Sequence, residues 1–173
     1  MQELIDRVKN QDRKAQEILY KKYADRFFYV CFRYVSNEND AAEVLNSSFY
    51  KIFLNIESFN YINNKAFEGW MYKILINESL MFLRQSCRNL VSIEIENAQL
   101  YSYGVEDENI SEEDCFKLLQ MLPEGYRTVF NLYAIEGYSH QEISEMFDIS
   151  ESTSRSQLCR ARQLLRSIIK KEI

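Results

Sequence analysis

Residues that form turns are scarce in this chain, and their scarcity limits the possible folds. Among its 173 residues are one proline and four glycines, well below the roughly 12% that these two types usually contribute. A β-sandwich or β-barrel needs a turn about every 8–12 residues, so these folds are excluded. Hydrophobic residues make up 46% and charged residues 27%, which suits a packed core. We therefore predict an all-α protein.

The chain is also poor in residues that bind metals or perform nucleophilic chemistry. It has one histidine, His140, and four widely separated cysteines without a CxxC pair (Cys31, Cys87, Cys115 and Cys159). No zinc site is expected, and the cysteines are interpreted as free thiols of a reducing compartment. Phosphate-binding glycine loops and a Ser–His–Asp arrangement are missing too. We expect no enzymatic activity, no cofactor and no metal, and we assign no chemistry to His140.

The sequence also lacks segments for export or membrane insertion. Residues 1–10 alternate in charge and contain no apolar run of the kind found in a signal peptide. No apolar run approaches the roughly 18 residues that a membrane span needs. We expect a cytoplasmic protein without membrane insertion.

Acidic residues are present in excess, but only in one place. The net charge of −5, taken alone, argues against nucleic-acid binding, because phosphates are neutralised by clustered Lys and Arg. Residues 91–114 hold eight acidic and no basic residues, whereas residues 1–90 hold 13 basic and 11 acidic ones. We predict two small helical domains, residues 1–90 and 112–173, joined by an acidic linker over residues 91–111. A merely solvated spacer is the alternative interpretation of this linker.

Apolar spacing predicts three helices in the first domain. One covers residues 12–35 and is capped by Asp12, the next runs from the turn at 36–40 to about residue 58, and the last covers residues 66–88. Residues 59–65 (FNYINNK) are predicted to form a loop.

The second domain has the signals of a helix-turn-helix. Helices are predicted over residues 112–122 and from Pro123, a residue suited to a first helical position, to Glu136. A capping box at residues 139–142 then opens a short helix to residue 147, and after a tight turn Ser150 caps a final helix over residues 151–171. A short capped helix, a turn and a longer helix are the parts of this DNA-binding motif.

The final helix has one apolar face and one cationic face. A helical wheel places its leucines and isoleucines together and gathers its arginines opposite them, with no acidic residue between Ser152 and Lys171. Guanidinium groups can contact guanine and phosphate in the major groove, and Ser154 would also suit a close approach to DNA. A solvated basic surface is the alternative. The candidate DNA-binding residues are Arg155, Ser156, Cys159, Arg160, Arg162 and Arg166.

A second polar strip lies in the first domain. Lys73 and Asn77 share a helix face beside the edge that carries Trp70, just after a loop with Tyr61, Asn63 and Asn64. Amides can hydrogen-bond base edges, and aromatic rings stack on unpaired bases. The alternative is that Trp70 belongs to the core, which is the more common role for such a residue, and that Lys73 belongs to an ordinary solvated face.

Four segments resemble bacterial sigma factors of the extracytoplasmic-function (ECF) group. Residues 67–77 (FEGWMYKILIN) resemble F-x-x-W-[LM]-[YF]-[RK]-I-A-x-N, and residues 122–130 (LPEGYRTVF) resemble L-P-x-x-x-R-x-V-[FL]. Residues 136–144 (EGYSHQEIS) and 155–162 (RSQLCRAR) resemble E-G-[YLF]-S-x-x-E-I-A and [RK]-S-[RQ]-L-x-R-A-R. The four segments occur in the order and spacing of the family, and the resemblance covers nearly the whole chain.

The resemblance implies a dissociable subunit that directs core RNA polymerase to promoters. Residues 1–90 would be region 2, which binds the β′ clamp and the −10 element, and residues 112–173 would be region 4, which binds the −35 element and the β flap. The candidate residues 155–166 would then contact the −35 element, and the strip in the first domain the −10 element. An anti-sigma factor is an expected partner. The resemblance assigns polymerase contacts to residues of the clamp-binding helix, namely Asp40, Glu43, Asn46 and Phe49.

The chain departs from the family pattern at Asn46, Ser47 and Ser48, where a Gln-Glu-Thr-like run is usual, and this affects the expected clamp contacts. Two other classes of protein remain open. A stand-alone helix-turn-helix regulator would bind an operator without polymerase, typically as a dimer on a palindrome. A helical interaction protein without a DNA role would bind its partners independently of salt.

Overall fold

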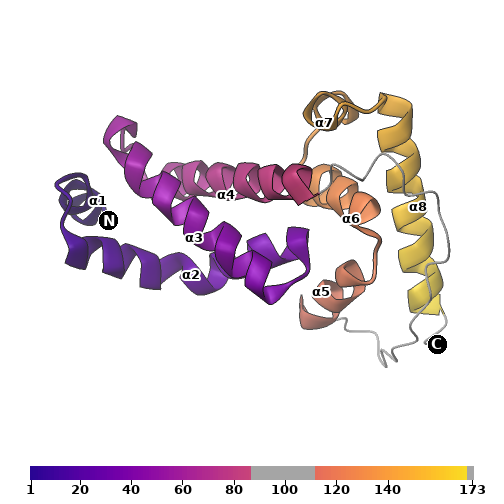
Figure 1. The fold of residues 1–173 in the computed structure, drawn as a ribbon, viewed down its shortest axis with the longest axis horizontal. Helices are drawn as coiled ribbons and strands as arrows, with labels where there is room; N and C mark the ends of the chain where they lie inside the picture. The colour runs from indigo at the N-terminus through magenta and orange to yellow at the C-terminus, as the bar shows by residue number, and fades with distance from the viewer. Residues whose placement is uncertain (87–111, 171–173) are drawn as a thin grey trace. The chain divides into compact units, whose positions relative to one another are not determined.

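The computed structural model describes residues 1–86 and 112–170. The regular elements in these two ranges are all helical, as the sequence predicts. The chain divides into two compact units, Met1–Gln85 and Ser86–Ile173, whose helices are coloured indigo to magenta and orange to yellow in Figure 1. The predicted acidic linker, residues 91–111, lies outside the described residues.

The first unit is built from α1 (Gln2–Lys9), α2 (Arg13–Val35), α3 (Glu38–Asn55), the 3-10 turn η1 (Ile56–Ser58) and α4 (Asn64–Ser86). The predicted cap of α2 is present, because an Asp12 carboxylate oxygen accepts the backbone N–H groups of Lys14 and Ala15. The short helix α1 is not predicted from the sequence. Only Ile5 and Val8 of this eight-residue helix are buried, too few to establish a periodicity.

The helix α4 begins two residues earlier than predicted. Asn63 caps it by accepting the backbone N–H of Ala66 at 2.8 Å, so that the last residues of the predicted loop are helical. The loop before it is held by Lys9, whose ammonium group donates to the backbone oxygen of Phe59 at 2.8 Å. The predicted loop is therefore shorter and is anchored to α1.

The core of the first unit is aromatic and aliphatic. α2 and α3 pack closely along their lengths, and α4 adds apolar residues to the same cluster. Hydrogen bonds also link α3 to α4. Glu78 of α4, which is 6% exposed, accepts one from the Ser47 hydroxyl and one from the Lys51 ammonium group of α3. The largest fully buried side chains of the cluster include Leu19, Phe27, Phe49, Ile52, Phe67 and Met71.

Gly69 lies inside α4 at a position with room for a side chain. A Cβ atom there would meet nothing within 4 Å. Glycine inside a helix costs about 1 kcal/mol relative to alanine, so Gly69→Ala is expected to raise the free energy of unfolding of the first unit by about that amount. Urea unfolding of the full chain measures it. Gly137→Ala is the matched control and is expected to destabilise the protein, because Gly137 has φ +80°.

The second unit is built from α5 (Glu112–Gln120), α6 (Glu124–Phe130), the π-helical turn η3 (Asn131–Ile135), α7 (His140–Phe147) and α8 (Glu151–Lys170). The sequence predicts a single helix from Pro123 to Glu136, but the structure has Pro123 as the N-cap and a π turn at the end. The apolar spacing does not reveal this change of hydrogen bonding. α8 packs against α5, α6 and α7.

One charged residue belongs to the core of the second unit. Arg127 is 5% exposed, and its guanidinium donates to the backbone oxygen of Leu122 at 3.0 Å. Burial lowers the pKa of this guanidinium. Arg127 therefore fastens the start of α6 to the end of the preceding segment, which gives the arginine of the L-P-x-x-x-R segment a structural role.

Candidate nucleic-acid interface

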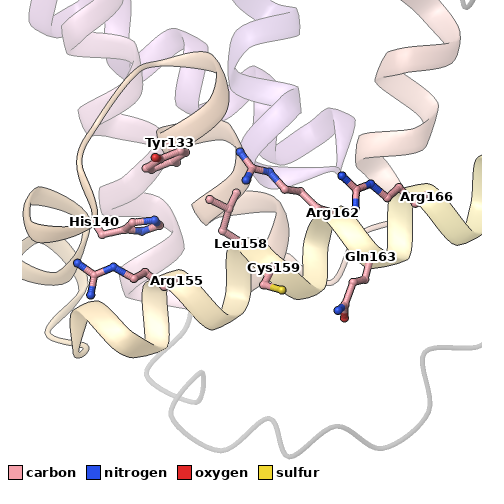
Figure 2. Close-up of a pocket in the computed structure, with 8 residues that line it drawn as sticks. All are labelled: Tyr133, His140, Arg155, Leu158, Cys159, Arg162, Gln163 and Arg166. Carbon is pink, nitrogen blue, oxygen red and sulfur yellow. The ribbon is translucent and has the colours of Figure 1, made fainter.

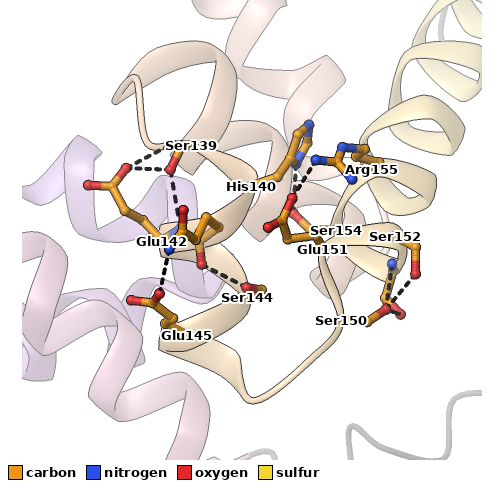
Figure 3. A network of polar contacts seen from close by, with 12 residues as sticks. Ser139, His140, Glu142, Ser144, Glu145, Ser150, Glu151, Ser152, Ser154 and Arg155 are labelled. Atoms are coloured by element: carbon orange, nitrogen blue, oxygen red, sulfur yellow. Dashed lines mark hydrogen bonds and ion pairs between the residues drawn. The ribbon is translucent and has the colours of Figure 1, made fainter.

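The two helices α7 and α8 and the turn between them form a helix-turn-helix. Ser139 and Glu142 make the predicted capping box, in which the Ser139 hydroxyl accepts the Glu142 N–H and the Glu142 carboxylate accepts the Ser139 N–H. Asp148 ends α7 in the left-handed conformation, at φ 53° and ψ 44°. The Ser150 hydroxyl then accepts the N–H of Thr153 at the start of α8. Figure 3 shows these contacts.

The capping box sets the start of α7, and its removal is testable. Ser139→Ala is expected to destabilise α7 by about 1 kcal/mol, which corresponds to roughly fivefold faster hydrogen exchange of the α7 amides. Mass spectrometry of the full chain measures the exchange. Ser144→Ala, which removes a hydroxyl that donates to the Gln141 carbonyl within α7, is the control. Equal exchange in the Ser139 variant and the wild-type chain would contradict the assignment.

The cationic face of α8 is solvent-exposed. The inward face of the helix buries Ser154, Leu158, Ala161 and Ile168. The opposite face carries the predicted DNA-binding residues, and all of them are exposed: Arg155, Ser156, Cys159, Arg160, Arg162 and Arg166. The structure thus brings the whole predicted set onto one surface.

Two of these arginines have an ion-pair or hydrogen-bond partner on the second unit. Arg155 forms an ion pair with Glu151, one turn earlier on α8, and the Arg160 guanidinium donates to the Tyr126 hydroxyl at 3.4 Å. Both contacts are exposed, and exposed pairs contribute little to stability. These guanidinium groups are therefore pre-positioned on the surface and can be redirected toward a ligand.

The prediction for Ser154 is wrong. This side chain is fully buried, and its hydroxyl lies 2.9 Å from Nδ1 of His140. It therefore contributes to packing between α7 and α8 and offers no surface for a close approach of DNA.

A pocket opens beside the cationic face. Tyr133 of η3 and His140 of α7 form one wall, and α8 forms the other, as Figure 2 shows. The two rings are stacked, with centroids 4.4 Å apart and planes at 18°. Sequence reasoning missed both residues, because nothing in the spacing brings Tyr133 and His140 together. The residues from α8 in this pocket are Arg155, Leu158, Cys159, Arg162, Gln163 and Arg166.

The candidate −10 residues of the first unit are partly engaged in structural contacts. The Tyr61 hydroxyl donates to Asn64 at 2.6 Å, and Asn63 caps α4. Trp70 packs on Phe59, with ring centroids 4.9 Å apart, and is partly buried against the core. Lys73 and Asn77 are exposed on α4. Lys73 and Asn77 are therefore available to a ligand, whereas Trp70 packs against the core, as the alternative interpretation of this residue predicts.

The expected polymerase-binding residues do not all lie on the surface. Glu43 and Asn46 of α3 are exposed, and Asp40 is partly buried. Asn46 also accepts a hydrogen bond from the Tyr20 hydroxyl at 3.2 Å. Phe49, in contrast, is 2% exposed and packs on the Tyr20 ring at a centroid distance of 4.6 Å. The structure does not place Phe49 on a binding surface, and we assign it to the core.

The departure of this chain from the family pattern falls mostly on the inner side of α3. The Ser47 hydroxyl donates to Glu78 of α4 at 2.8 Å, and the fully buried Ser48 donates to the Val44 carbonyl at 2.7 Å. Of the three departing residues, only Asn46 is exposed. Ser47 and Ser48 therefore make their hydrogen bonds within the first unit.

Within the described residues, no helix is long and apolar enough to cross a membrane, and no cluster of three or more His, Cys, Asp or Glu side chains could hold a metal ion. The described cysteines, Cys31, Cys115 and Cys159, are free. Burial raises the pKa of the Cys31 thiol to about 12.

Two family models match the two units. Residues 19–88 match sigma-70 region 2, and residues 116–165 match sigma-70 region 4. The chain is 33% identical over 181 residues to the ECF RNA polymerase sigma-E factor of Haemophilus influenzae, with 97% of this chain and 94% of that protein covered. It is 30% identical over 146 residues to the RNA polymerase sigma factor SigV of Bacillus subtilis, with 84% of this chain and 86% of that protein covered.

Solved structures share the fold. CnrH in complex with the cytosolic domain of CnrY matches with a TM-score of 0.52 at 18% identity, covering 98% of this chain and 97% of that one. The sigma factor RpoE of Bartonella quintana in complex with the anti-sigma factor NepR matches with a TM-score of 0.51 at 19% identity, covering 89% and 96%. Family models match both sigma regions in order, and the sigma factors of Haemophilus influenzae and Bacillus subtilis align along most of the chain and of their own length. The chain therefore belongs to the sigma-70 family and is an RNA polymerase sigma factor of the ECF group.

Proposed function

We propose that the two units divide promoter recognition. In this proposal the first unit binds core polymerase and the −10 element, and the second unit reads the −35 element. The observation that carries the proposal is the face of α8, where six predicted DNA-binding residues are exposed opposite an apolar, buried face. A helix with these two faces can pack on its own unit while its outer side enters a major groove.

In the second unit, Arg155, Ser156, Cys159 and Arg160 meet base edges of the −35 element. Arg162 and Arg166 hold its phosphates, since they lie further along α8. A bidentate contact from arginine to guanine contributes about 1–3 kcal/mol of discrimination against a wrong base. The unit also contacts the β flap of the polymerase, which holds it beside the upstream DNA.

In the first unit, the exposed residues Glu43 and Asn46 and the neighbouring Asp40 dock α3 on the β′ clamp. The loop over residues 59–63 and the polar strip of α4 then capture a base of the −10 element that has left the stack. Extruding a base costs a few kcal/mol, which contacts in the loop offset. The exposed amide and ammonium groups of Asn77 and Lys73 support this role.

An anti-sigma factor is the further partner in this proposal, since the similar solved structure of the sigma factor RpoE is a complex with the anti-sigma factor NepR. Such a partner would cover the faces that meet polymerase and DNA. The site of action is the cytoplasm, where core polymerase and the chromosome lie.

Run-off transcription tests the proposal. Purified full-length protein is added to core polymerase with a pool of DNA in which the promoter region is randomised, and the transcribed templates are sequenced. We expect initiation only when the protein is present, from templates that share two conserved blocks. Absence of specific initiation, together with binding of the protein alone to a palindromic site, would instead indicate a stand-alone regulator.

A further inference from the structure

The pocket between η3, α7 and α8 contains a histidine whose position is fixed from two sides. The His140 ring is stacked on Tyr133, and its Nδ1 lies 2.9 Å from the hydroxyl of the fully buried Ser154. In Figure 2 both rings lie on the α7 side of the pocket, facing the arginines of α8. A stacked and hydrogen-bonded ring is more restricted than an ordinary surface histidine, so its other nitrogen has a defined place.

The contact with Ser154 also bears on where the ring carries its hydrogen. When the buried Ser154 hydroxyl donates to Nδ1, the neutral imidazole of His140 carries its hydrogen on Nε2, and the protonated ring carries one there as well. Within the described part of the chain, Nε2 of His140 makes no hydrogen bond with protein atoms. In that tautomer, and in the protonated ring whichever way the Ser154 contact runs, His140 offers an Nε2–H donor to a ligand in the pocket.

Three arginines of α8 line the same pocket as His140. The Arg162 guanidinium lies over the Tyr133 ring, 5.9 Å from its centroid, and Arg155 and Arg166 line the same pocket. Two acidic side chains lie beside His140: Glu151 is paired with Arg155, and Glu142 is held in the capping box. Guanidinium groups next to an N–H donor are suited to an oxyanion, above all a phosphate.

The position in the fold favours a backbone phosphate over a base. In a helix-turn-helix the second helix reads base edges, while the first helix crosses the DNA backbone. His140 is the first residue of α7, the first helix of the motif, and Arg162 lies on α8 three turns after its start. We propose, on the basis of the proposed −35 function, that this pocket binds one DNA phosphate through Nε2–H of His140 and the guanidinium of Arg162.

A phosphate in the pocket would make DNA binding dependent on pH. In the free protein the pKa of His140 is lowered, first by burial and then by Arg155, with a smaller effect of the same sign from Arg162 and an opposing effect from Glu151. Tyr133 of η3 and Ser154 of α8 contact the ring as neutral groups, and Glu142 on α7 is held in the capping box. A bound phosphate favours the protonated ring, so affinity for the promoter rises as the pH falls.

The test uses the full chain in complex with core polymerase and a promoter obtained in the run-off selection. Single backbone phosphates around the −35 element are replaced by neutral methylphosphonates, and promoter affinity is measured by filter binding. For the wild-type chain we expect one phosphate whose replacement weakens binding about tenfold. With His140→Ala or Arg162→Gln, replacement of the same phosphate is expected to change affinity less than twofold. If at every phosphate the loss of affinity caused by the methylphosphonate simply adds to the loss caused by His140→Ala or Arg162→Gln, the proposal is wrong.

The His140→Gln variant separates a ligand role from a packing role. An amide can still donate but cannot titrate, so this variant is expected to lose the pH dependence while keeping most of the affinity at pH 7.5. Between pH 8 and pH 6 the wild-type affinity is expected to rise about three- to tenfold relative to that of the variant. Identical pH profiles would contradict the proposal. Arg13→Gln, an exposed arginine on α2, controls for the loss of one charge in Arg162→Gln.

The same experiment distinguishes a failure of the proposed promoter-binding function from a failure of the phosphate pocket. Wild-type protein that gives no promoter-specific complex with core polymerase contradicts the proposed function itself. A specific complex whose affinity shows no coupling between His140 and any phosphate leaves the proposed function in place and removes only the phosphate pocket.

Discussion

Replacing Arg155 and Arg160 together with alanine is expected to lower run-off transcription from a −35-dependent promoter by about 30-fold or more. Each arginine is proposed to contact a base edge, and two such contacts at about 1–3 kcal/mol each set this scale. Both side chains are exposed, with only a surface ion pair and one long hydrogen bond to give up. The measurement is initial transcription rate at limiting holoenzyme concentration.

The matched control for this double variant removes two positive charges elsewhere. Arg13 and Lys14 are exposed at the start of α2, and the Arg13→Ala/Lys14→Ala variant is expected to transcribe at close to the wild-type rate. Thermal unfolding of both variants checks that they remain folded. If the Arg155/Arg160 variant transcribes like the control, α8 does not read the −35 element through these residues.

Phe49→Ala is expected to lower the free energy of unfolding of the first unit by about 3–5 kcal/mol, the range found for large aromatic side chains removed from cores. Its ring is 2% exposed and packs on Tyr20, Phe27 and Phe53. That loss is a large fraction of the 5–15 kcal/mol that usually separates folded from unfolded protein. Urea unfolding of the full chain measures it.

The neighbouring residue provides the control for Phe49. Tyr50 is 65% exposed on the same helix, and Tyr50→Ala is expected to change stability by less than about 0.5 kcal/mol. For the exposed Glu43 we expect the opposite pattern, in which Glu43→Ala weakens polymerase binding and leaves stability unchanged. A Phe49→Ala variant of unchanged stability that fails to bind polymerase would show that Phe49 is a contact residue after all.

The sequence predicted the parts of this fold that depend on local rules. The caps at Asp12, Ser139 and Ser150 and the tight turn after residue 147 occur where the sequence places them, since each depends on neighbours within a few residues. The cationic face of α8 was equally readable, because a helical wheel needs only the period of the helix.

What the sequence could not predict depends on contacts between distant residues. The apolar spacing of α3 places Phe49 on one stripe with Val44, Leu45 and Ile52, whereas the family resemblance assigned it a polymerase contact; its packing on Tyr20 and Phe27 places it in the core. The stacking of Tyr133 on His140 joins the π turn η3 to α7, and this π turn has no signature in the apolar pattern. The tie from Glu78 to Ser47 and Lys51 spans 27 to 31 residues, and no local rule reaches that far.

The central claim, that α8 of the second unit reads the −35 element independently of the first unit, is tested most directly by repeating the promoter selection with the Arg155→Ala/Arg160→Ala variant. Templates randomised at both elements are transcribed by core polymerase with wild-type or variant protein, and the two sets of enriched sequences are compared. The account predicts that the variant loses the upstream conserved block and keeps the −10 block. An unchanged upstream block, or the loss of both blocks by a folded variant, would contradict it.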